Sequence, residues 1–433
     1  MILDNMSKKK QIPLYVKILA GMLLGVIVGI IGVLLGLKNI YSDWIAPFGK
    51  IFMNLLKLIA IPLIFVSLIK GVSGLKDISQ LSRLGIKTLS FYIISTVIAI
   101  SFGLVLVNII QPGTSFPKDM QEQLVSQQKE TIEKKQEIVK EKQEEGPLRF
   151  LVNIVPENFF KAASSNRSML QVIFFALIFG IAIILLPEEK TKTVRSFFDE
   201  LNDVILKIID LIMKFAPFGV FALMAAIITD IAGDDIANTI PIFKALGLYS
   251  LTVIIGLLAM IFIIYPVFLK IFTKRKYLDF YRAILPAQLM AFSTSSSSAT
   301  LPVTMECAEE NLGIDKKISS FVLPVGATVN MDGTSLYQAV AAVFIAQVFG
   351  MDLSIGQQLT IVVTATLASI GSAGVPGAGI VMLIIVLEAI GVPSSGIAFI
   401  FAVDRLLDML RTVVNITGDS TINAIMAESD KQK

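Results

Sequence analysis

Two runs of small residues interrupt the apolar C-terminal half of this chain: STSSSSATLP at Ser293–Pro302 and SIGSAGVPGAG at Ser369–Gly379. Each run lies between apolar arms that are too short to cross a bilayer, which takes about 20 residues. We therefore predict two helical hairpins that dip half-way into a membrane, with the small residues at their tips. Such tips offer hydroxyls and backbone N–H groups at helix N-termini, which favour anions. Paired interrupted segments of this kind indicate the binding site of a transporter.

The composition of the whole chain is that of a membrane protein. Of 433 residues, 55% are apolar and 16% are charged, and the mean hydropathy is +0.77, whereas a soluble domain carries roughly 25% charged residues. The chain has no His and one Cys, Cys307, which excludes His-based catalytic triads, His or thiolate metal sites and internal disulfides. The net charge of +3 is too small to indicate nucleic-acid binding. We expect an all-α polytopic membrane protein.

Hydropathy divides the chain into six uninterrupted apolar runs followed by four that contain more polar residues. These segments lie at about 14–35, 45–75, 84–110, 168–187, 198–229, 243–272, 276–310, 316–349, 355–386 and 392–425. The first run has no cleavage site and is too long for a signal peptide, so we expect it to be retained. The loops rich in Lys and Arg all fall on one side of the membrane, the cytoplasmic side, only if 276–310 and 355–386 are hairpins. This predicts eight spans with both termini cytoplasmic. The mixed-charge segment 118–145 is then an extracellular, passive connection.

A GxxxG repeat, made of Gly21, Gly25 and Gly29, lies in the first span. Small residues at this spacing let helices approach closely in lipid. The repeat predicts tight helix packing, with a subunit contact as the alternative.

The last span carries five polar residues in line: Asp404, Asp408, Arg411, Asn415 and Asp419. Their spacing places all five on one helical face. Charge inside a bilayer is expensive and marks functional positions. This stripe predicts a path for substrate and ions, and the alternative is an ion-pair ladder that only fixes helix packing.

The seventh span contains NMDGT at Asn330–Thr334, shortly after Gly326. Gly next to Asn and Asp predicts a break in the helix, and irregular backbone at this depth is tolerated where it lines a cavity or is buried in protein. The freed carbonyls, together with Asp332, suit a hard cation such as Na⁺. The alternative is a simple kink, which would not need both Asn330 and Asp332.

Four motifs together resemble one family of transporters. They are SSSSATLP at 295–302, NMDGT at 330–334, GSAGVPGAG at 371–379 and DMLRTVVNITGD at 408–419. In order and spacing they closely resemble the dicarboxylate/amino acid:cation symporters, which include excitatory amino acid transporters and archaeal aspartate transporters. The resemblance covers nearly the whole chain.

The resemblance implies eight transmembrane helices and two re-entrant hairpins with inverted repeats, in a homotrimer of the plasma membrane that works as an elevator. A scaffold would comprise residues 1–80 (helices 1 and 2) and 151–235 (helices 4 and 5). A mobile transport domain would comprise 81–111 (helix 3) and 236–433 (helix 6, hairpin 1, helix 7, hairpin 2 and helix 8), and 112–150 would be the extracellular charged loop. The second hairpin would be the extracellular gate.

The resemblance also implies the roles of individual residues. Asp408 would bind the substrate ammonium, and Arg411 would bind its side-chain carboxylate in a bidentate manner. Further substrate contacts would come from Ser296, Ser297, Thr334, Val375, Gly379, Thr412 and Asn415. Three Na⁺ sites would be formed by Gly326, Asn330, Asn415 and Asp419; by Thr328, Ser369, Ile370 and Ser372; and by Tyr92, Ser95, Thr96, Asn330 and Asp332.

Two positions depart from other members of this family. Archaeal members have an Arg just before the first tip, where this chain has Ser295, and Arg405 is the candidate to supply that charge. Carriers that co-transport a proton have a Glu where this chain has Gln338. We therefore expect co-transported Na⁺ without a proton.

The charged pair in the last span selects the substrate. Arg411 favours a carboxylate-bearing side chain because a buried guanidinium rejects analogues that leave it unpaired, and Asp408 disfavours plain C4-dicarboxylates. We expect an importer of L-aspartate or L-glutamate, with no organic cofactor. The alternatives are a cystine or C4-dicarboxylate symporter, proton coupling and an associated anion conductance. We do not expect an enzyme, since the chain lacks His and a G-x-S-x-G motif.

Overall fold

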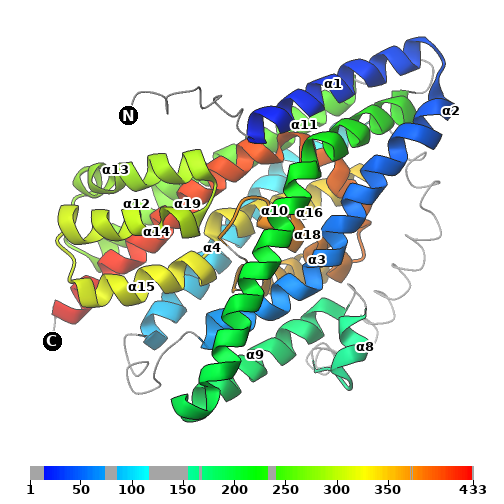
Figure 1. Ribbon diagram of the computed structural model, residues 1–433. Helices are drawn as coiled ribbons and strands as arrows, with labels where there is room; N and C mark the ends of the chain where they lie inside the picture. Colours follow the sequence, from blue (N-terminus) through cyan, green and yellow to red (C-terminus); the bar gives the residue numbers. More distant parts are fainter. Residues whose placement is uncertain are drawn as a thin grey trace, which may run out of the picture. The chain divides into compact units, whose positions relative to one another are not determined.

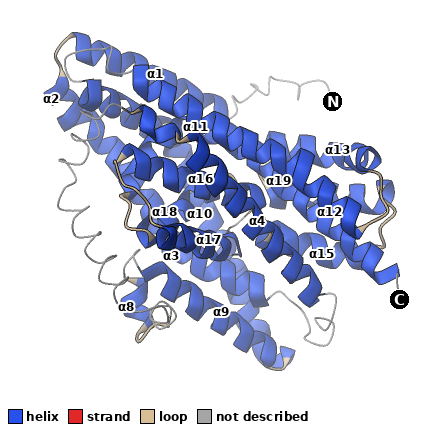
Figure 2. Ribbon diagram, turned by 180° about the vertical axis from the view of Figure 1, so that it is seen from behind, coloured by secondary structure: helices blue, strands red, loops and turns tan. Residues whose placement is uncertain are grey.

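The computed structural model describes residues 14–73, 85–116, 155–164, 168–232, 240–370, 372 and 374–431, and these residues form helices and loops without a strand (Figure 1, Figure 2). The predicted connection at 118–145 lies outside these ranges. The chain forms two compact units, Met1–Leu55 with Asp210–Ile240, and Leu56–Ile209 with Pro241–Lys433. The predicted scaffold and transport domain are distinguished by their movement relative to each other. Contacts within one structure do not test such movement, so this division of the chain stays a prediction.

The first unit is held together by close packing of its first helix. Its elements are α1 (Leu14–Leu34), α2 (Lys38–Ile40), η1 (Tyr41–Ile45), the start of α3 (Ala46–Ser73) and the end of α10 (Glu188–Ala232). A Cβ atom at Gly21 would overlap the carbonyl oxygen of Pro217, and one at Gly25 would lie 2.5 Å from that of Phe221. The GxxxG repeat is therefore a helix-packing surface within the chain, as predicted.

The second unit contains every residue predicted to bind substrate or ions. Besides the remaining parts of α3 and α10, its elements are α4 (Ile86–Ile110), η3 (Pro112–Ser115), α8 (Phe159–Ala163), α9 (Met169–Leu185), α11 (Ile240–Ala259), η6 (Met260–Ile264), α12 (Tyr265–Phe272), α13 (Tyr277–Thr294), α14 (Ser297–Glu306), η7 (Cys307–Asn311), α15 (Lys316–Val329), α16 (Asp332–Val348), α17 (Ile355–Ile370), α18 (Ala378–Ala389), η8 (Ser394–Gly396) and α19 (Ile397–Lys431).

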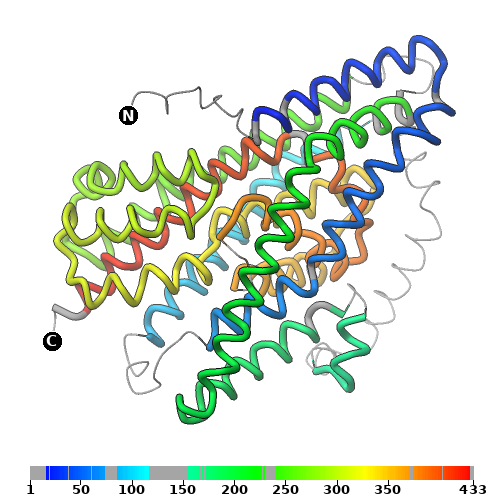
Figure 3. Tube along the Cα trace, viewed as in Figure 1, coloured from blue at the N-terminus to red at the C-terminus, as the bar shows by residue number. Residues whose placement is uncertain are grey.

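Helix α16 lies at the centre of the second unit. Its side chains are buried on all faces, and it packs against α4, α17, α18 and α19. The trace in Figure 3 can be followed along α19, in red, which also packs against α13 and α15. A helix that is apolar or small all round requires such complete burial.

Both predicted hairpins are present. In the first, α13 packs against α14, and the turn is made by Ser295, whose φ is 51°. In the second, α17 packs against α18, which begins after Gly377 at a φ of 81°. The two tips meet: Ser296 Oγ donates a hydrogen bond to the Gly374 carbonyl at 2.6 Å, and the Ser298 N–H donates to the same oxygen at 3.2 Å.

Five helical stretches of the described residues are long and apolar enough to cross a membrane. They are Val16–Leu34, Tyr41–Ser73, Ile86–Ser115, Glu188–Ala226 and Ile240–Phe272. The other predicted spans are the shorter α9, the broken pair α15 and α16, and α19, which carries the polar stripe. The protein is thus a multi-pass helical membrane protein, while the count of eight spans and the cytoplasmic termini stay predictions.

The packing of α1 predicts that Gly21→Ala lowers the thermal unfolding temperature of the detergent-solubilised protein by a few degrees. The new methyl group would overlap backbone, and overpacking costs about 1–3 kcal/mol. Gly247→Ala is the matched control, because Gly247 lies inside α11 with nothing within 4 Å of the new Cβ. Differential scanning fluorimetry measures both variants, and equal unfolding temperatures would contradict the packing described here.

Candidate functional site

The helix break predicted in the seventh span lies between α15 and α16. Asn330 (φ −97°, ψ 92°) and Met331 (φ −115°, ψ 50°) leave the helical region, and the helix resumes at Asp332. Asn330 and Asp332 are completely buried. The break therefore exposes backbone groups and two polar side chains to the interior of the protein.

Asp332 is surrounded by hydroxyl groups from two other helices. Ser95 Oγ and Thr96 Oγ1 of α4 donate to its two carboxylate oxygens at 2.7 Å each, and Tyr265 Oη of α12 donates at 2.9 Å. Ser95 Oγ also lies 3.2 Å from Asn330 Oδ1. This cluster of oxygen atoms has the chemistry that hard cations prefer.

Asp419 forms a second carboxylate cluster on the other side of the break. Asn330 Nδ2 donates to Asp419 Oδ1 at 2.9 Å, so Asn330 joins the two clusters. A Cβ atom at Gly326 would lie 2.5 Å from both Asp419 Oδ1 and Tyr92 Oη. Only glycine fits here, which explains why the chain has Gly326 one helical turn before the break.

Asn415 connects the break to α19. Its Oδ1 accepts a hydrogen bond from the Gly333 N–H at 2.8 Å. Its Nδ2 donates to Met331 Sδ at 3.2 Å and to Thr334 Oγ1 at 3.3 Å. The amide thus holds the start of α16 against the polar stripe of α19.

Arg411 lies at the centre of a buried charged group. Its Nη2 is 2.6 Å from Asp408 Oδ1 and 3.0 Å from Asp404 Oδ1, and its guanidinium carbon lies 3.8 Å from the centre of the Tyr337 ring. Arg405 Nη1 pairs with Asp408 Oδ2 at 3.4 Å. Arg411 Nε and Nη1 are buried without a hydrogen-bond partner, so the guanidinium retains unused donors.

The second hairpin covers this charged group. The Gly377 N–H donates to Asp408 Oδ2 at 3.2 Å, and Gln338 Nε2 donates to the Gly379 carbonyl at 3.3 Å. A Cβ atom at Gly379 would lie 3.3 Å from Arg411 Nη1. A larger residue at this position would take up the space beside the unused donor of Arg411.

Asp332 and Asp419 differ from the carboxylates of the charged group in having no cationic partner. Among the residues that the structure describes, no Lys or Arg nitrogen lies within 4.0 Å of either one. The same residues contain no group of three or more His, Cys, Asp or Glu side chains that could hold a metal. A buried carboxylate without a cationic partner is costly, so these two carboxylates rely on the neutral donors that surround them.

The amino-acid sequence that forms this site matches a family model over almost the entire chain. The sequence model described as "Sodium:dicarboxylate symporter family" matches residues 14–429. The chain belongs to this family. It is therefore a symporter of the membrane and not an enzyme.

Relatives of this symporter include animal and bacterial proteins. Excitatory amino acid transporter 3 from Oryctolagus cuniculus is 38% identical, with 99% of this chain and 88% of the relative covered. The proton/sodium-glutamate symport protein from Geobacillus stearothermophilus is 37% identical, with 98% and 96% covered. Excitatory amino acid transporter 1 from Ambystoma tigrinum is 37% identical, with 86% and 75% covered. The similarity thus extends over the full set of elements described above.

Most of the predicted site residues of the symporter contact one another in the structure. Others, such as Thr328 and Thr412, use their hydroxyl groups only within their own helix. Ser369 Oγ donates to the Val329 carbonyl and accepts from the Met331 N–H, which places it at the helix break. The Thr328 hydroxyl donates within its own helix, and the Thr412 hydroxyl donates to the Asp408 carbonyl. Ser372 donates its N–H to the Ser369 carbonyl. The predicted ion site of Thr328, Ser369, Ile370 and Ser372, which would use their backbone carbonyls, stays a prediction.

The first tip uses its serines differently from the predicted substrate contact. The Ser296 hydroxyl accepts from the Ala299 N–H, capping α14, and donates to Gly374 of the other tip. Ser297 is buried and Val375 is half-buried. The substrate contacts of Ser296, Ser297 and Val375 stay predictions.

Two residues of the site were missed in the sequence. Tyr265 reaches Asp332 from α12, and Tyr337 lies against Arg411 from α16. A tyrosine in an apolar helix resembles any other core aromatic, so its partner becomes visible only in the fold. The one signal available was that a buried phenol needs a hydrogen-bond partner.

The contact between Tyr265 and Asp332 predicts a coupled effect on stability. Tyr265→Phe should lower the thermal unfolding temperature, because it removes a hydrogen bond to a buried carboxylate, which contributes about 1.5–3 kcal/mol. The same substitution should have a much smaller effect when Asp332 is already replaced in Asp332→Asn. A double-mutant cycle measured by differential scanning fluorimetry tests this, and an identical effect of Tyr265→Phe in both backgrounds would refute the coupling.

Proposed function

We propose that this symporter imports an acidic amino acid, L-aspartate or L-glutamate, together with Na⁺. Its relatives include excitatory amino acid transporters and a proton/sodium-glutamate symport protein, and their names support this substrate class. The single observation that carries the proposal is the buried Arg411 guanidinium with unused donors at Nε and Nη1 beside Asp408.

The Asp408–Arg411 pair has the two charges that an acidic amino acid needs. The substrate ammonium would bind Asp408, and its side-chain carboxylate would bind Arg411, so the substrate would replace one internal ion pair by two pairs with the protein. The α-carboxylate would be met by N–H and hydroxyl groups of the hairpin tips. A neutral amino acid would leave Arg411 without a side-chain carboxylate, and a plain dicarboxylate would leave Asp408 without an ammonium. Further contacts are proposed for Ser296, Ser297, Thr334, Val375, Gly379, Thr412 and Asn415.

Three Na⁺ ions are proposed as co-transported cargo around the helix break. One would be held by Gly326, Asn330, Asn415 and Asp419, another by Tyr92, Ser95, Thr96, Asn330 and Asp332, and another by Thr328, Ser369, Ile370 and Ser372. No Lys or Arg of the described residues pairs with the buried carboxylates of Asp332 and Asp419, which supports the first two sites, since a bound Na⁺ would supply a compensating positive charge. Oxygen ligands suit this cation.

The geometry of the break suggests how the ions are coupled to the substrate. Asn330 touches both carboxylate clusters, and Asn415 joins Met331 and Thr334 to the stripe that holds Arg411. A cation that orders the segment 330–334 would also order the substrate contacts of Thr334 and Asn415. The affinity for substrate and the affinity for Na⁺ would then rise together, as linkage requires.

An elevator movement in a homotrimer is the transport mechanism that we propose. Every residue of the proposed site lies within one compact unit, so the site can move without being taken apart. The second hairpin would act as the gate, and its opening would break the contact between Gly377 and Asp408. Exchange of access by a moving body around an intact site is a common design in transporters with inverted repeats.

The role of Arg411 is tested by Arg411→Cys. Uptake of L-aspartate and L-glutamate into proteoliposomes should fall at least a hundredfold, because a buried charged hydrogen-bond partner is lost, and L-serine should become a substrate. Arg282→Cys, which changes an exposed arginine of the first hairpin, is the control and should transport normally. Unchanged affinity of Arg411→Cys for L-aspartate would overturn the assignment, and cystine as the preferred substrate of the unaltered protein would replace it.

The role of Asp419 is tested by Asp419→Asn, which keeps the shape of the side chain and removes its charge. The Na⁺ concentration for half-maximal L-aspartate uptake should rise at least tenfold, because the carboxylate beside Gly326 and Asn330 would no longer attract the cation. Asp352→Asn changes an exposed carboxylate and should leave the Na⁺ titration unaltered. An unaltered titration in Asp419→Asn would contradict this ion site.

A further inference from the structure

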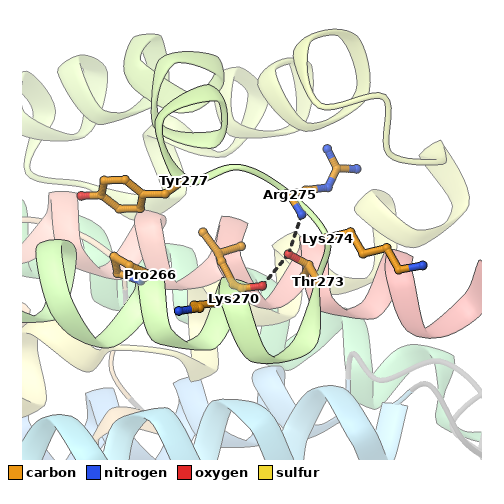
Figure 4. Close-up of a pocket in the computed structure, with 7 residues that line it drawn as sticks. Pro266, Lys270, Thr273, Lys274, Arg275 and Tyr277 are labelled. Carbon is orange, nitrogen blue, oxygen red and sulfur yellow. Dashed lines mark hydrogen bonds between the residues drawn. The ribbon is translucent and has the colours of Figure 1, made fainter.

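A basic pocket lies away from the substrate and ion site, where α12 ends and α13 begins. Its volume is about 390 Å³, and its lining residues, most of which Figure 4 labels, are Pro266, Leu269, Lys270, Thr273, Lys274, Arg275 and Tyr277. None of these residues belongs to the proposed transport site. Lys270 and Tyr277 lie at one end of the view, and Lys274 and Arg275 extend from the other end.

The loop that carries these cations is fixed by its own hydrogen bonds. Thr273 Oγ1 donates to the Leu269 carbonyl at 2.7 Å and accepts from the Arg275 N–H at 3.2 Å. Arg275 Nη1 donates to the Leu312 carbonyl at 2.8 Å. Lys274 and Arg275 therefore lie on a pre-ordered turn, and Lys270 lies in α12, which lowers the entropy cost of binding a ligand.

The charges at this pocket are not neutralised by the protein. No Asp or Glu of the described residues lies within 4.0 Å of a side-chain nitrogen of Lys270, Lys274 or Arg275, and Arg275 Nε is buried without a hydrogen-bond partner. Helix α13, which is 18 residues long, begins at Tyr277 and adds the positive end of its dipole. The pocket is thus suited to an anion.

The two helices that line the pocket also carry exposed apolar side chains. Val267, Ile271 and Phe272 of α12 and Leu278 of α13 are exposed in the chain. In a membrane protein such side chains face lipid acyl chains, and Tyr277 is of the type found at the level of the headgroups. A single ligand that combines an anionic head with apolar chains would satisfy both surfaces, which a soluble anion would not.

We propose that this pocket binds the phosphate of an anionic phospholipid headgroup, with the acyl chains along the exposed face of α12. Basic pockets between transmembrane helices bind lipid headgroups in this way. The proposal does not depend on which substrate or ion is transported. The lipid site lies where α12 is joined to α13, the first helix of the first hairpin. A bound lipid would therefore contact the residues at which that hairpin begins.

Native mass spectrometry of the purified full chain tests the proposal. The protein is titrated with phosphatidylglycerol and, separately, with zwitterionic phosphatidylcholine of the same acyl chains. We expect phosphatidylglycerol to bind more tightly, and Lys270→Gln/Lys274→Gln to weaken its binding about tenfold. Arg275 is left unchanged in this variant because its bond to Leu312 fixes the loop.

Three controls decide between the pocket and general surface charge. Lys316→Gln/Lys317→Gln, which removes two exposed lysines, should bind as the unaltered protein does, and Lys270→Arg/Lys274→Arg should retain binding. Glycerol phosphate, added in excess, should fail to displace the lipid. Equal losses in the two glutamine variants, no loss in Lys270→Gln/Lys274→Gln, or displacement by glycerol phosphate would each overturn the proposal.

Discussion

The break between Val329 and Asp332 is the constraint on which the rest of the site depends. It places two completely buried polar residues, Asn330 and Asp332, at a depth where each must be satisfied by other parts of the chain. Helix α4 supplies hydroxyls, α12 supplies a phenol, and α19 supplies Asp419 and Asn415. The segments that surround the break are thus held together by their hydrogen bonds to its buried polar groups.

The buried charges of this symporter are compensated in two different ways. Around Arg411, Asp404 and Asp408 neutralise a guanidinium that still has unused donors. Around the break, Asp332 and Asp419 are met only by neutral groups of the described residues. The first arrangement fits exchange with a substrate that carries both charges, and the second fits a bound cation. Asn415, which touches Thr334 and Met331 and lies one helical turn from Arg411, joins the two.

The sequence predicted the features that depend on local pattern. The helix break, the stripe on α19 and both hairpins were predicted because Gly, Pro, Asn and charged residues are conspicuous in an apolar chain. Contacts between distant segments were not predictable in this way. The bond between Ser296 and Gly374 joins tips separated by 78 positions, and Tyr265 has no local sign of its contact with Asp332. In the sequence, Lys270 and Lys274 were only two of the Lys and Arg residues from which the membrane topology was predicted. The fold shows that they also line a pocket.

The central claim is that a Na⁺ gradient drives uptake of an acidic amino acid by this protein. The most direct measurement is uptake of radiolabelled L-aspartate and L-glutamate into proteoliposomes at fixed pH, with and without an inward Na⁺ gradient. We expect that at least one of them accumulates, that this accumulation requires Na⁺ and that a Na⁺ ionophore abolishes it. Accumulation that ignores Na⁺ and follows an imposed pH gradient would contradict the assignment of Asp332 and Asp419 to sodium.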